Sequence, residues 1–239
     1  MAISGQTGTV LRSVACLHYQ STSTESLRMT TNSNLRLYHC KGSRSLRPLW
    51  MLEELGLDYD LTVLPFPPRV LQKDYLAINP LGTIPCFFDG EMRMTESPAI
   101  CHYLAEKFGG AQGKPGLHVR ADEADYGRYL NWLYFSDATL TFPQTIVLRY
   151  TQLEPEPRRL PQAASDYRAW FYGRLRSVDA AVKESEYLVA NRFTAADIAI
   201  GFALHLATLI GIDQDFSPPV RAYLDRLTAR DAFKRANAR

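Results

Sequence analysis

The turn from Cys40 to Ser45, with the sequence CKGSRS, is the first place where residue types and spacing indicate chemistry. A hydroxyl at the mouth of a helix can donate a hydrogen bond to a thiolate and lower the pKa of the corresponding thiol. A free thiol with a pKa of about 8.5 is only about 3% ionised at pH 7, and a pKa lower by about two makes the thiolate the majority species. Ser43 is the candidate for this role, although an ordinary helix cap is the commoner role of serine at such a place.

A proline close to the start of an expected strand marks the second candidate, Ile84-Pro85 within the segment NPLGTIP. Such a proline forfeits a hydrogen bond of the sheet, so another benefit must offset the loss. A cis Ile84-Pro85 bond would turn the amide and carbonyl of Ile84 outward, where an extended peptide could pair with them as an added strand. A trans proline at a strand edge is the alternative, and it is the commoner arrangement.

The segment Glu96-Ser97-Pro98 is the third candidate, because serine followed by proline is typical of a helix start. The free amides and partial positive charge of a helix N-terminus can hold a ligand carboxylate, and Glu96 could hold an ammonium group nearby. Together these groups suit the head group of an amino acid. The alternative is that Ser97 only caps its own helix and that Glu96 is a solvated carboxylate.

The composition is globular and gives little support to a charge-driven partner. The 239 residues carry 27 Lys and Arg against 25 Asp and Glu, a net charge of +2, and no basic block is longer than Arg158-Arg159. We therefore expect neither nucleic acid nor a membrane as a partner. The longest nearly apolar stretch, 198–212, has about 15 residues where a membrane span needs about 20, so it predicts a buried helix.

The cysteines show no CxxC pair and no disulfide-dense spacing; the four are Cys16, Cys40, Cys86 and Cys101. This usage suits a reducing compartment better than secretion, and it predicts a cytoplasmic protein. For the same reason we expect no structural zinc and no other metal cofactor.

The elements that position the three candidates follow one another in the order βαβ and then αββα. Short apolar runs predict strands over 35–40, 59–64, 84–88 and 91–94, with Asp89-Gly90 as the turn of a hairpin. Helical spacing predicts helices over 45–55, ended by Gly56, over 70–77, and from Pro98 onward. This order predicts a compact α/β domain over 35–110.

The sequence GGAQGKPG between Phe108 and Leu117 breaks every periodicity and is the expected linker. Beyond it, helical patterns fill roughly 119–150, 163–186, 194–211 and 217–236, and no convincing strand appears. We therefore expect an all-helical second domain over 119–239. Thr194 and Asp197 fit a capping pattern at the start of one of its helices.

Residues 1–34 carry twelve Ser or Thr, two Arg and a single acidic residue, Glu25. This is the composition of a disordered tail. It is also similar to an organellar transit peptide, which is Ser-rich and acid-poor, although two arginines are few for that purpose.

Taken in order, four segments resemble the glutathione transferase family over residues 35–236; they are SRSLRPLWMLEELGL, NPLGTIP, TESPAICHYLAEKFG and FTAADIAIGFAL. The resemblance is to serine-type members, bacterial theta-like or related. It implies an α/β thioredoxin-like N-terminal domain that binds glutathione as co-substrate. It also implies an all-α C-terminal domain that supplies much of the pocket for an electrophile, and a homodimer.

The resemblance also assigns roles to the three candidates. Ile84 resembles the family position whose backbone pairs with the cysteinyl part of glutathione, and Pro85 resembles its cis-proline. Glu96 and Ser97 resemble the pair that holds the γ-glutamyl head group.

Counting back from Arg47, Ser43 falls where serine-type members keep the hydroxyl that activates the sulfur, which makes it the predicted catalytic residue. The implied function is a detoxifying transferase in which the glutathione thiolate attacks a small, mostly apolar electrophile. At helical spacing, an aromatic group could either line the electrophile pocket or belong to the core; its members are Trp132, Tyr134, Phe135, Phe142 and Trp170.

Two other functions stay open at this point. Cys40 to Ser43 also forms a CxxS pattern, which would make the protein a glutathione-dependent thiol-disulfide oxidoreductase that uses Cys40. The other alternative is a noncatalytic binding module with the same fold. Cys86 and Cys101 are expected to be buried structural thiols.

Overall fold

The computed structural model describes residues 34–110 and 116–239 of the chain. All of them belong to one compact unit, Thr31–Arg239. The segment 1–34, expected to be a disordered tail or a targeting segment, lies outside the described residues except for Asn34. The centre of the expected linker lies outside them as well.

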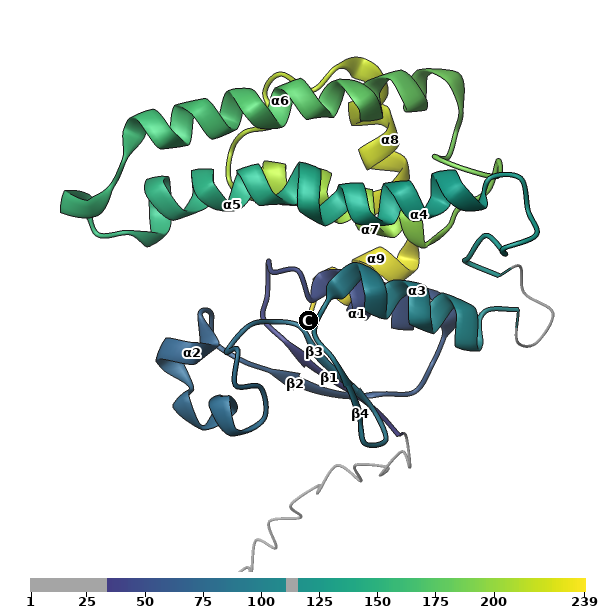
Figure 1. Ribbon diagram of the computed structural model, residues 1–239, viewed down its shortest axis with the longest axis horizontal. Coiled ribbons are helices and arrows are strands. Elements are labelled where there is room, and N and C mark those ends of the chain that lie inside the picture. The colour runs from purple at the N-terminus through teal and green to yellow at the C-terminus, as the bar shows by residue number, and fades with distance from the viewer. Residues whose placement is uncertain (1–33, 111–115) are drawn as a thin grey trace, which may run out of the picture. The chain divides into compact units, whose positions relative to one another are not determined.

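A four-stranded sheet is built from the first part of the described chain (Figure 1). Its strands are β1 (Leu35–His39), β2 (Asp60–Val63), β3 (Cys86–Asp89) and β4 (Met92–Met94), in the spatial order β2-β1-β3-β4. β1 runs parallel to β2 and antiparallel to β3, and β3 pairs antiparallel with β4. The predicted thioredoxin-like order of strands and helices is confirmed.

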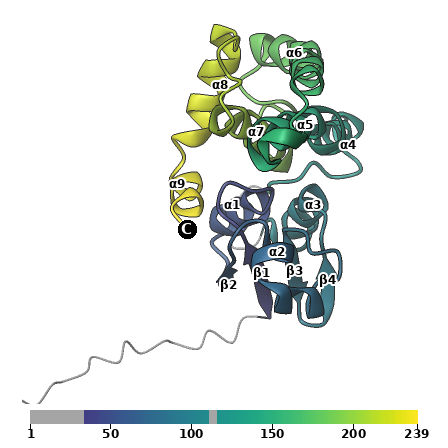
Figure 2. The same ribbon diagram turned by 90° about the vertical axis from the view of Figure 1, so that its left-hand side faces the viewer.

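Helices α1 (Leu46–Leu55) and α3 (Ser97–Phe108) lie side by side on one face of the sheet (Figures 1 and 2). That face carries the fully buried pair Leu37 and Phe87 from β1 and β3. Because successive side chains of a strand alternate between its faces, the next inward residue of β1 is His39. Helix α1 ends at Gly56, whose φ of 60° is the left-handed conformation that favours glycine.

Helix α2 (Pro68–Leu71) and the 3₁₀ turn Lys73–Ala77 together occupy the segment predicted as one short helix. Tyr75 from this turn packs against Tyr38 of β1, with 5.6 Å between ring centroids. The following loop is held by Asn79, which is buried and whose side-chain amide donates to the carbonyl of Thr83 at 2.9 Å. This bond fixes the segment that leads into Ile84.

Residues 116–239 contain helices and no strand, as the sequence predicted. The helices are α4 (Tyr126–Tyr134), α5 (Phe142–Leu148), α6 (Pro161–Glu184), α7 (Ala195–Leu209), α8 (Pro218–Thr228) and α9 (Asp231–Asn237). A π-helical turn over Phe135–Thr141 joins α4 to α5. The helix predicted from 119 starts later, at Tyr126. The one predicted over 217–236 divides at Arg230, whose backbone is extended.

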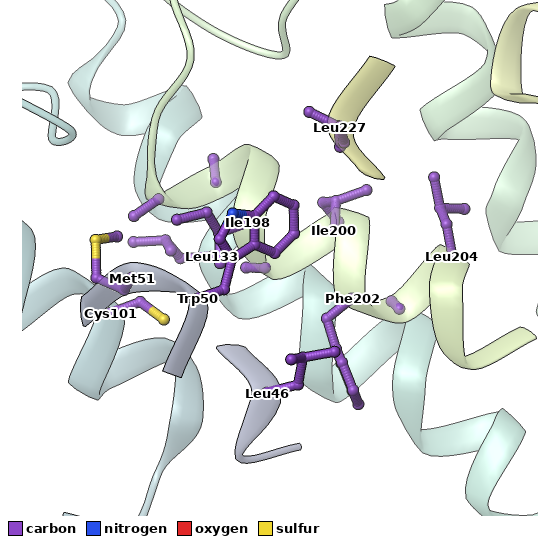
Figure 3. Packing of buried hydrophobic residues seen from close by; sticks show 14 of the residues in the cluster. Leu46, Trp50, Met51, Cys101, Leu133, Ile198, Ile200, Phe202, Leu204 and Leu227 are labelled. Atoms are coloured by element: carbon purple, nitrogen blue, oxygen red, sulfur yellow. The ribbon is translucent and has the colours of Figure 1, made fainter. Parts of the chain in front are cut away.

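Helix α7 forms the centre of the core, because twelve of its 15 residues are buried. Figure 3 shows Ile198, Ile200 and Phe202 of α7 beside Leu46 and Trp50 of α1. A Cβ at Gly201 would lie 2.8 Å from a methyl group of Leu227 and 3.2 Å from the Trp50 ring, so a larger residue here would require both neighbours to shift. The apolar core is therefore continuous from the sheet side of the molecule into the helices.

The predicted capping box at the start of α7 is present. Thr194 accepts a hydrogen bond from the Ala196 amide, and the carboxylate of Asp197 accepts one from the Thr194 amide at 2.8 Å. Asp197 also accepts from the hydroxyl of Tyr223 at 2.7 Å. These bonds satisfy a buried helix end, so Thr194 and Asp197 act in folding.

Candidate active site

Ser43 lies in the turn between β1 and α1, at the mouth of the helix. Its amide donates to the Cys40 carbonyl at 3.2 Å, and its own carbonyl accepts from the Leu46 amide at 2.9 Å, so two overlapping turns fix the backbone. Gly42 supplies the positive φ of 68° that the first turn requires. The Ser43 side chain is half-buried, so it is fixed on one side and open on the other.

The Ser43 hydroxyl belongs to a short row of polar groups. Its Oγ lies 2.7 Å from the Cys40 carbonyl oxygen and 2.8 Å from the Oγ of Ser45. The Ser45 hydroxyl is fully buried, accepts from the Cys40 amide at 3.1 Å and lies 2.8 Å from Nδ1 of His39. Ser45, the residue at the cap position of α1, makes no side-chain capping bond, whereas the Ser43 Oγ accepts from the Ser45 amide at 3.4 Å, so Ser43 keeps a long, cap-like contact at the helix start.

His39 ends this row inside the protein, where its side chain is 2% exposed. Burial lowers the pKa of His39 to about 4; a hydrogen bond with the Ser45 backbone opposes the shift and the charge of Lys41 adds to it. The imidazole is therefore neutral at physiological pH.

Ile84-Pro85 is a cis bond, which decides between the two alternatives that the sequence left open. Tyr38 of β1 pairs in register with Cys86 of β3. Ile84-Pro85 therefore lies at the end of the sheet where β1 enters the Ser43 turn. Within the described residues, the amide and the carbonyl of Ile84 have no backbone hydrogen-bond partner. An extended peptide could pair with them.

Glu96 is the residue at the cap position of α3, and Ser97 is the first residue of the helix. The expectation that Ser97 caps this helix is wrong, because Ser97 lies one position inside it and no side-chain capping bond forms. Instead, the Ser97 Oγ accepts from Nη1 of Arg47 at 3.0 Å. A guanidinium only donates, so the hydroxyl hydrogen of Ser97 is left for another partner. The Glu96 side chain is exposed.

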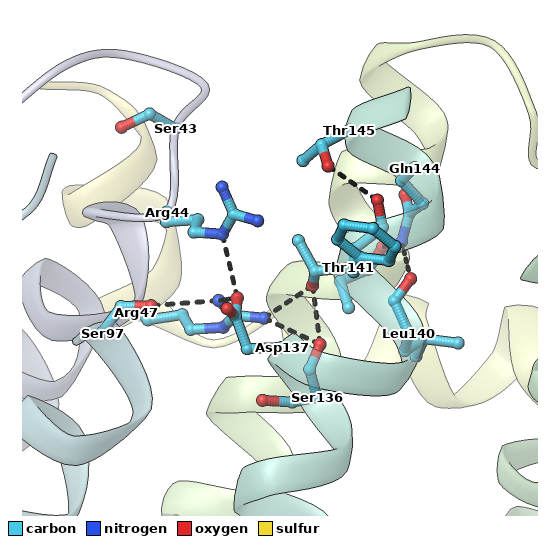
Figure 4. Close-up of polar contacts among 12 residues, drawn as sticks. Ser43, Arg44, Arg47, Ser97, Ser136, Asp137, Leu140, Thr141, Gln144 and Thr145 are labelled. Carbon is cyan, nitrogen blue, oxygen red and sulfur yellow. Dashed lines mark hydrogen bonds and ion pairs between the residues drawn. The ribbon is translucent and has the colours of Figure 1, made fainter. Parts of the chain in front are cut away.

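Arg47 holds Ser97 in place from the buried side of α1 (Figure 4). Its side chain is 0% exposed, and each of its three nitrogens donates to an oxygen. The acceptors are Ser97 and Asp137 on Nη1, the Ser136 carbonyl and Thr141 on Nη2, and the Ala199 carbonyl on Nε. These five bonds use every N–H of a guanidinium. Arg47 thus ties α1 to α3, α7 and the π-helical turn.

Asp137 is shared between Arg47 and the neighbour of the candidate serine, Arg44, with a distance of 2.9 Å to each. Burial opposes ionisation of Asp137, but the charges of Arg47 and Arg44 hold the pKa of its carboxyl below the ordinary value. The charged cluster therefore lies directly under the turn that carries Ser43.

Cys40 is poorly suited to thiol chemistry. Its side chain is 0% exposed, and burial raises the pKa of its thiol to about 11. Its Sγ lies 3.6 Å from the Pro65 carbonyl oxygen, which can accept only from the protonated thiol. Cys86 and Cys101 are also buried and free, as predicted, and burial raises the pKa of both thiols.

The aromatic group divides between core and surface. Trp132 of α4 is buried and packs against the half-buried Phe135 of the π-helical turn, with 5.2 Å between ring centroids, so these two lie on the core side. Phe142 and Trp170 are 45% and 43% exposed, on either side of Tyr167.

Leu209, which the sequence did not single out, lies nearer to the turn. It is half exposed at the end of α7, and a Cβ at Gly42 would lie 3.6 Å from its methyl group. An apolar surface therefore stands beside the turn that carries Ser43.

Among the described residues, no group of three or more His, Cys, Asp or Glu side chains is arranged to hold a metal ion. Within the same ranges, every helix is too short or too polar to cross a membrane.

The chain is similar in sequence to several known proteins. A family model described as "Glutathione S-transferase, N-terminal domain" matches residues 43–107. Glutathione S-transferase 3 of Schizosaccharomyces pombe is 29% identical over 181 residues, which are 72% of this chain and 73% of that protein.

Two solved structures have a similar fold. A glutathione transferase of Methylococcus capsulatus strain Bath has 25% identity and a TM-score of 0.74, with 85% of this chain and 97% of that chain covered. A sphingomonad glutathione S-transferase complexed with glutathione has 25% identity and a TM-score of 0.73, with the same two coverages of 85% and 97%.

The family model, the curated relatives and the solved structures all indicate the glutathione transferase family. The predicted fold, a thioredoxin-like α/β part followed by an all-helical part, and the predicted class of enzyme are both confirmed. The serine-type subclass and the roles of Ser43, Ile84, Pro85, Glu96 and Ser97 stay predictions.

Proposed function

We propose that this protein is a glutathione transferase in which the Ser43 hydroxyl donates a hydrogen bond to the sulfur of bound glutathione and keeps it anionic. The observation that carries the proposal is the position of Ser43, half-buried at the mouth of α1 and at the same end of the sheet as Ile84. The helix N-terminus adds a partial positive charge that favours an anion at this place. The hydroxyl hydrogen of Ser43, which points at the Cys40 carbonyl oxygen in this structure, would turn to the sulfur when the ligand binds.

The remaining candidates hold the rest of the tripeptide in this proposal. The unpaired backbone of Ile84, with Pro85 beside it, receives the cysteinyl part as an added strand. Ser97 donates its free hydrogen to the γ-glutamyl carboxylate at the start of α3, where the helix amides also point. The exposed carboxylate of Glu96 accepts from the ammonium group.

The second substrate is a small, mostly apolar electrophile that lies over Leu209, next to the Ser43 turn. The thiolate forms a bond to the electrophilic carbon, and a leaving group departs with the electrons of its own bond. Holding both reactants supplies proximity as well as activation. In this proposal, residues 35–110 form the glutathione-binding domain and residues 119–239 form the electrophile-binding domain.

We further propose that the protein works as a homodimer. A groove of about 370 Å³ between α3 and α4 is lined mainly by apolar atoms, and its lining includes Pro98, Ala99, Leu133 and Tyr134. Tyr134 is 72% exposed, which is a large aromatic area for a monomer to leave in water. The free thiols of Cys40, Cys86 and Cys101 fit a reducing, cytoplasmic setting, where conjugation of electrophiles would serve detoxification.

The two other functions are less well supported. An oxidoreductase that uses Cys40 needs an accessible thiolate, whereas this thiol is buried and its pKa is raised to about 11. A noncatalytic module would bind glutathione without ionising its thiol, and it would show no turnover in the assays that follow.

The experiment is a panel of conjugation, reduction and isomerisation assays with glutathione on the parent and on Ser43→Ala. A hydrogen bond to a charged group is worth about 1.5 to 3 kcal/mol, which corresponds to a rise of about one to two in the pKa of the thiol; from a bound pKa of about 6.5, the thiolate fraction at pH 7, and turnover with it, should fall about 3- to 25-fold. Glutathione affinity, measured by calorimetry, should be retained because Ile84, Glu96 and Ser97 are untouched. Equal turnover in the two proteins would remove Ser43 from the mechanism.

A further inference from the structure

His39, Ser45 and Ser43 form a continuous row of hydrogen-bonding groups, which we call the relay. Nδ1 of His39 lies 2.8 Å from Oγ of Ser45, and Oγ of Ser45 lies 2.8 Å from Oγ of Ser43. His39 and Ser45 are 2% and 0% exposed, so water does not compete for these contacts. The relay therefore runs from the interior of the sheet to the hydroxyl beside the proposed sulfur position.

Counting hydrogens fixes the direction of every bond in the relay. Ser43 Oγ lies 2.7 Å from the Cys40 carbonyl oxygen, which can only accept, so the single hydroxyl hydrogen of Ser43 points there. The contact between Ser43 and Ser45 must then use the hydrogen of Ser45. Ser45 has no second hydrogen, so its contact with His39 requires Nδ1 of the imidazole to donate.

A competing arrangement is weaker in this geometry. Ser45 could donate to the Cys40 carbonyl instead, but that distance is 3.4 Å, beyond the usual range of a hydroxyl hydrogen bond. The remaining lone pair of Ser45 is taken by the Cys40 amide at 3.1 Å. Ser45 thus accepts from His39 and from the Cys40 amide and donates to Ser43, which satisfies the buried hydroxyl completely.

We propose that His39 is a positioning residue that acts through Ser45 to point the Ser43 hydrogen outward and to strengthen it as a donor. The inference rests on the proposed function, because it deepens the role of Ser43. As long as Nδ1 of His39 donates, Ser45 must donate to Ser43, and Ser43 cannot turn its hydrogen inward. Only the Cys40 carbonyl and an incoming sulfur then remain as its acceptors. No proton changes owner in this step; only the Ser43 hydroxyl rotates.

Successive hydrogen bonds polarise one another, so the donor at the end of a row is stronger than an isolated hydroxyl. Without the imidazole, Ser45 would be free to accept from Ser43 and to draw its hydrogen away from the ligand. A residue that only accepts at position 39 would reverse the relay for the same reason. The neutral imidazole suits this place because it supplies one donor without a buried charge.

The first test compares His39→Leu, which removes the donor, with His39→Asn, which places an amide nitrogen close to the position of Nδ1. The readout is the pKa of the thiol of bound glutathione, which is measured from the ultraviolet absorbance of the thiolate as the pH is varied. We expect His39→Leu to raise this pKa by about 0.5 to 1 and His39→Asn to restore at least half of the change. An unchanged thiol pKa in His39→Leu, with the effect of Ser43→Ala still present, overturns the relay alone.

The same substitutions in a Ser43→Ala background separate positioning from a structural role. If His39 acts through Ser43, His39→Leu has no further effect on the thiol pKa once the hydroxyl is gone. An equal rise in both backgrounds means that His39 acts on the site by another route and overturns the proposal. If Ser43→Ala itself leaves the thiol pKa unchanged, the proposed function fails and the relay with it.

The second test needs no variant that might fold poorly. Nitrogen-15 NMR of the histidine rings in the parent protein distinguishes the two neutral tautomers of His39. The relay requires the tautomer with the hydrogen on Nδ1. A His39 ring with its hydrogen on Nε2 would accept from Ser45 and contradict the proposal directly.

Discussion

Replacing Arg47 by Met is the change that tests the packing of the site most severely. Methionine keeps an apolar stem that ends at about the position of Nε, so the substitution removes the guanidinium and retains the packing of the stem. The lost contacts are five hydrogen bonds between 2.8 and 3.2 Å, one of them to the carboxylate of Asp137. The cation also leaves the face of the Phe202 ring, 4.5 Å from its centroid.

The size of the effect follows from what remains after the substitution. Breaking a buried ion pair by removal of one partner costs about 3 to 5 kcal/mol. Asp137 keeps its bond to Arg44 and is 28% exposed, so the lower part of that range applies, and we expect about 3 kcal/mol. The Ser97 hydroxyl also loses its anchor, and glutathione affinity should fall with it.

Arg44→Met is the matched control, because it removes the other arginine of Asp137. Arg44 is 35% exposed and makes a single bond to the carboxylate, so its loss should cost less than about 1 kcal/mol. Urea denaturation of the parent and of both variants gives the free energies of unfolding. If Arg47→Met were no more destabilising than Arg44→Met, Arg47 would not hold the parts of the site together.

Three further predictions concern Cys40, Tyr134 and His39. Cys40→Ala should keep conjugating turnover within about threefold of the parent, because the buried thiol takes no part in the chemistry. If the parent showed no conjugation and the variant lost all disulfide reduction, the oxidoreductase would be favoured. Tyr134→Glu should shift the mass measured by light scattering from dimer toward monomer, and an unchanged dimer would move the interface elsewhere. The folded-state pKa of His39 lies below the unfolded value of 6.5, at about 4, so the unfolded chain takes up the proton first as the pH falls. Relative to His39→Asn, the parent should therefore lose up to about 3 kcal/mol of stability between pH 6.5 and 4. If the difference in free energy of unfolding between the two proteins stayed the same over this pH range, the prediction would be wrong.

Local patterns were sufficient for most of the fold. The alternation of β1, the left-handed Gly56 and the capping box at Thr194 each depend on residues within a few positions of one another, so their signals stand in the sequence. Boundaries were less well predicted. The division of the last predicted helix at Arg230 follows from ion pairs and packing against α1, such as the bond between Arg230 and Glu54.

The candidate site was predicted only where its parts are local. Ser43, Ile84 and Glu96 stand beside turns and helix starts that a pattern can indicate. The contacts of Arg47 reach partners from 50 to 152 positions away, and no spacing reports on them. The bond between His39 and Ser45 spans only six positions, but it joins the inward face of a strand to a helix cap, and that geometry exists only after folding.

The pKa of the thiol of bound glutathione, measured by its thiolate absorbance in the parent and in Ser43→Ala, is the decisive quantity. We expect the parent to hold this pKa about two below that of a free thiol, near 6.5, and Ser43→Ala to return it by about one or more. A bound thiol that titrates at the same pH in both proteins would contradict the role of Ser43 and the mechanism built on it.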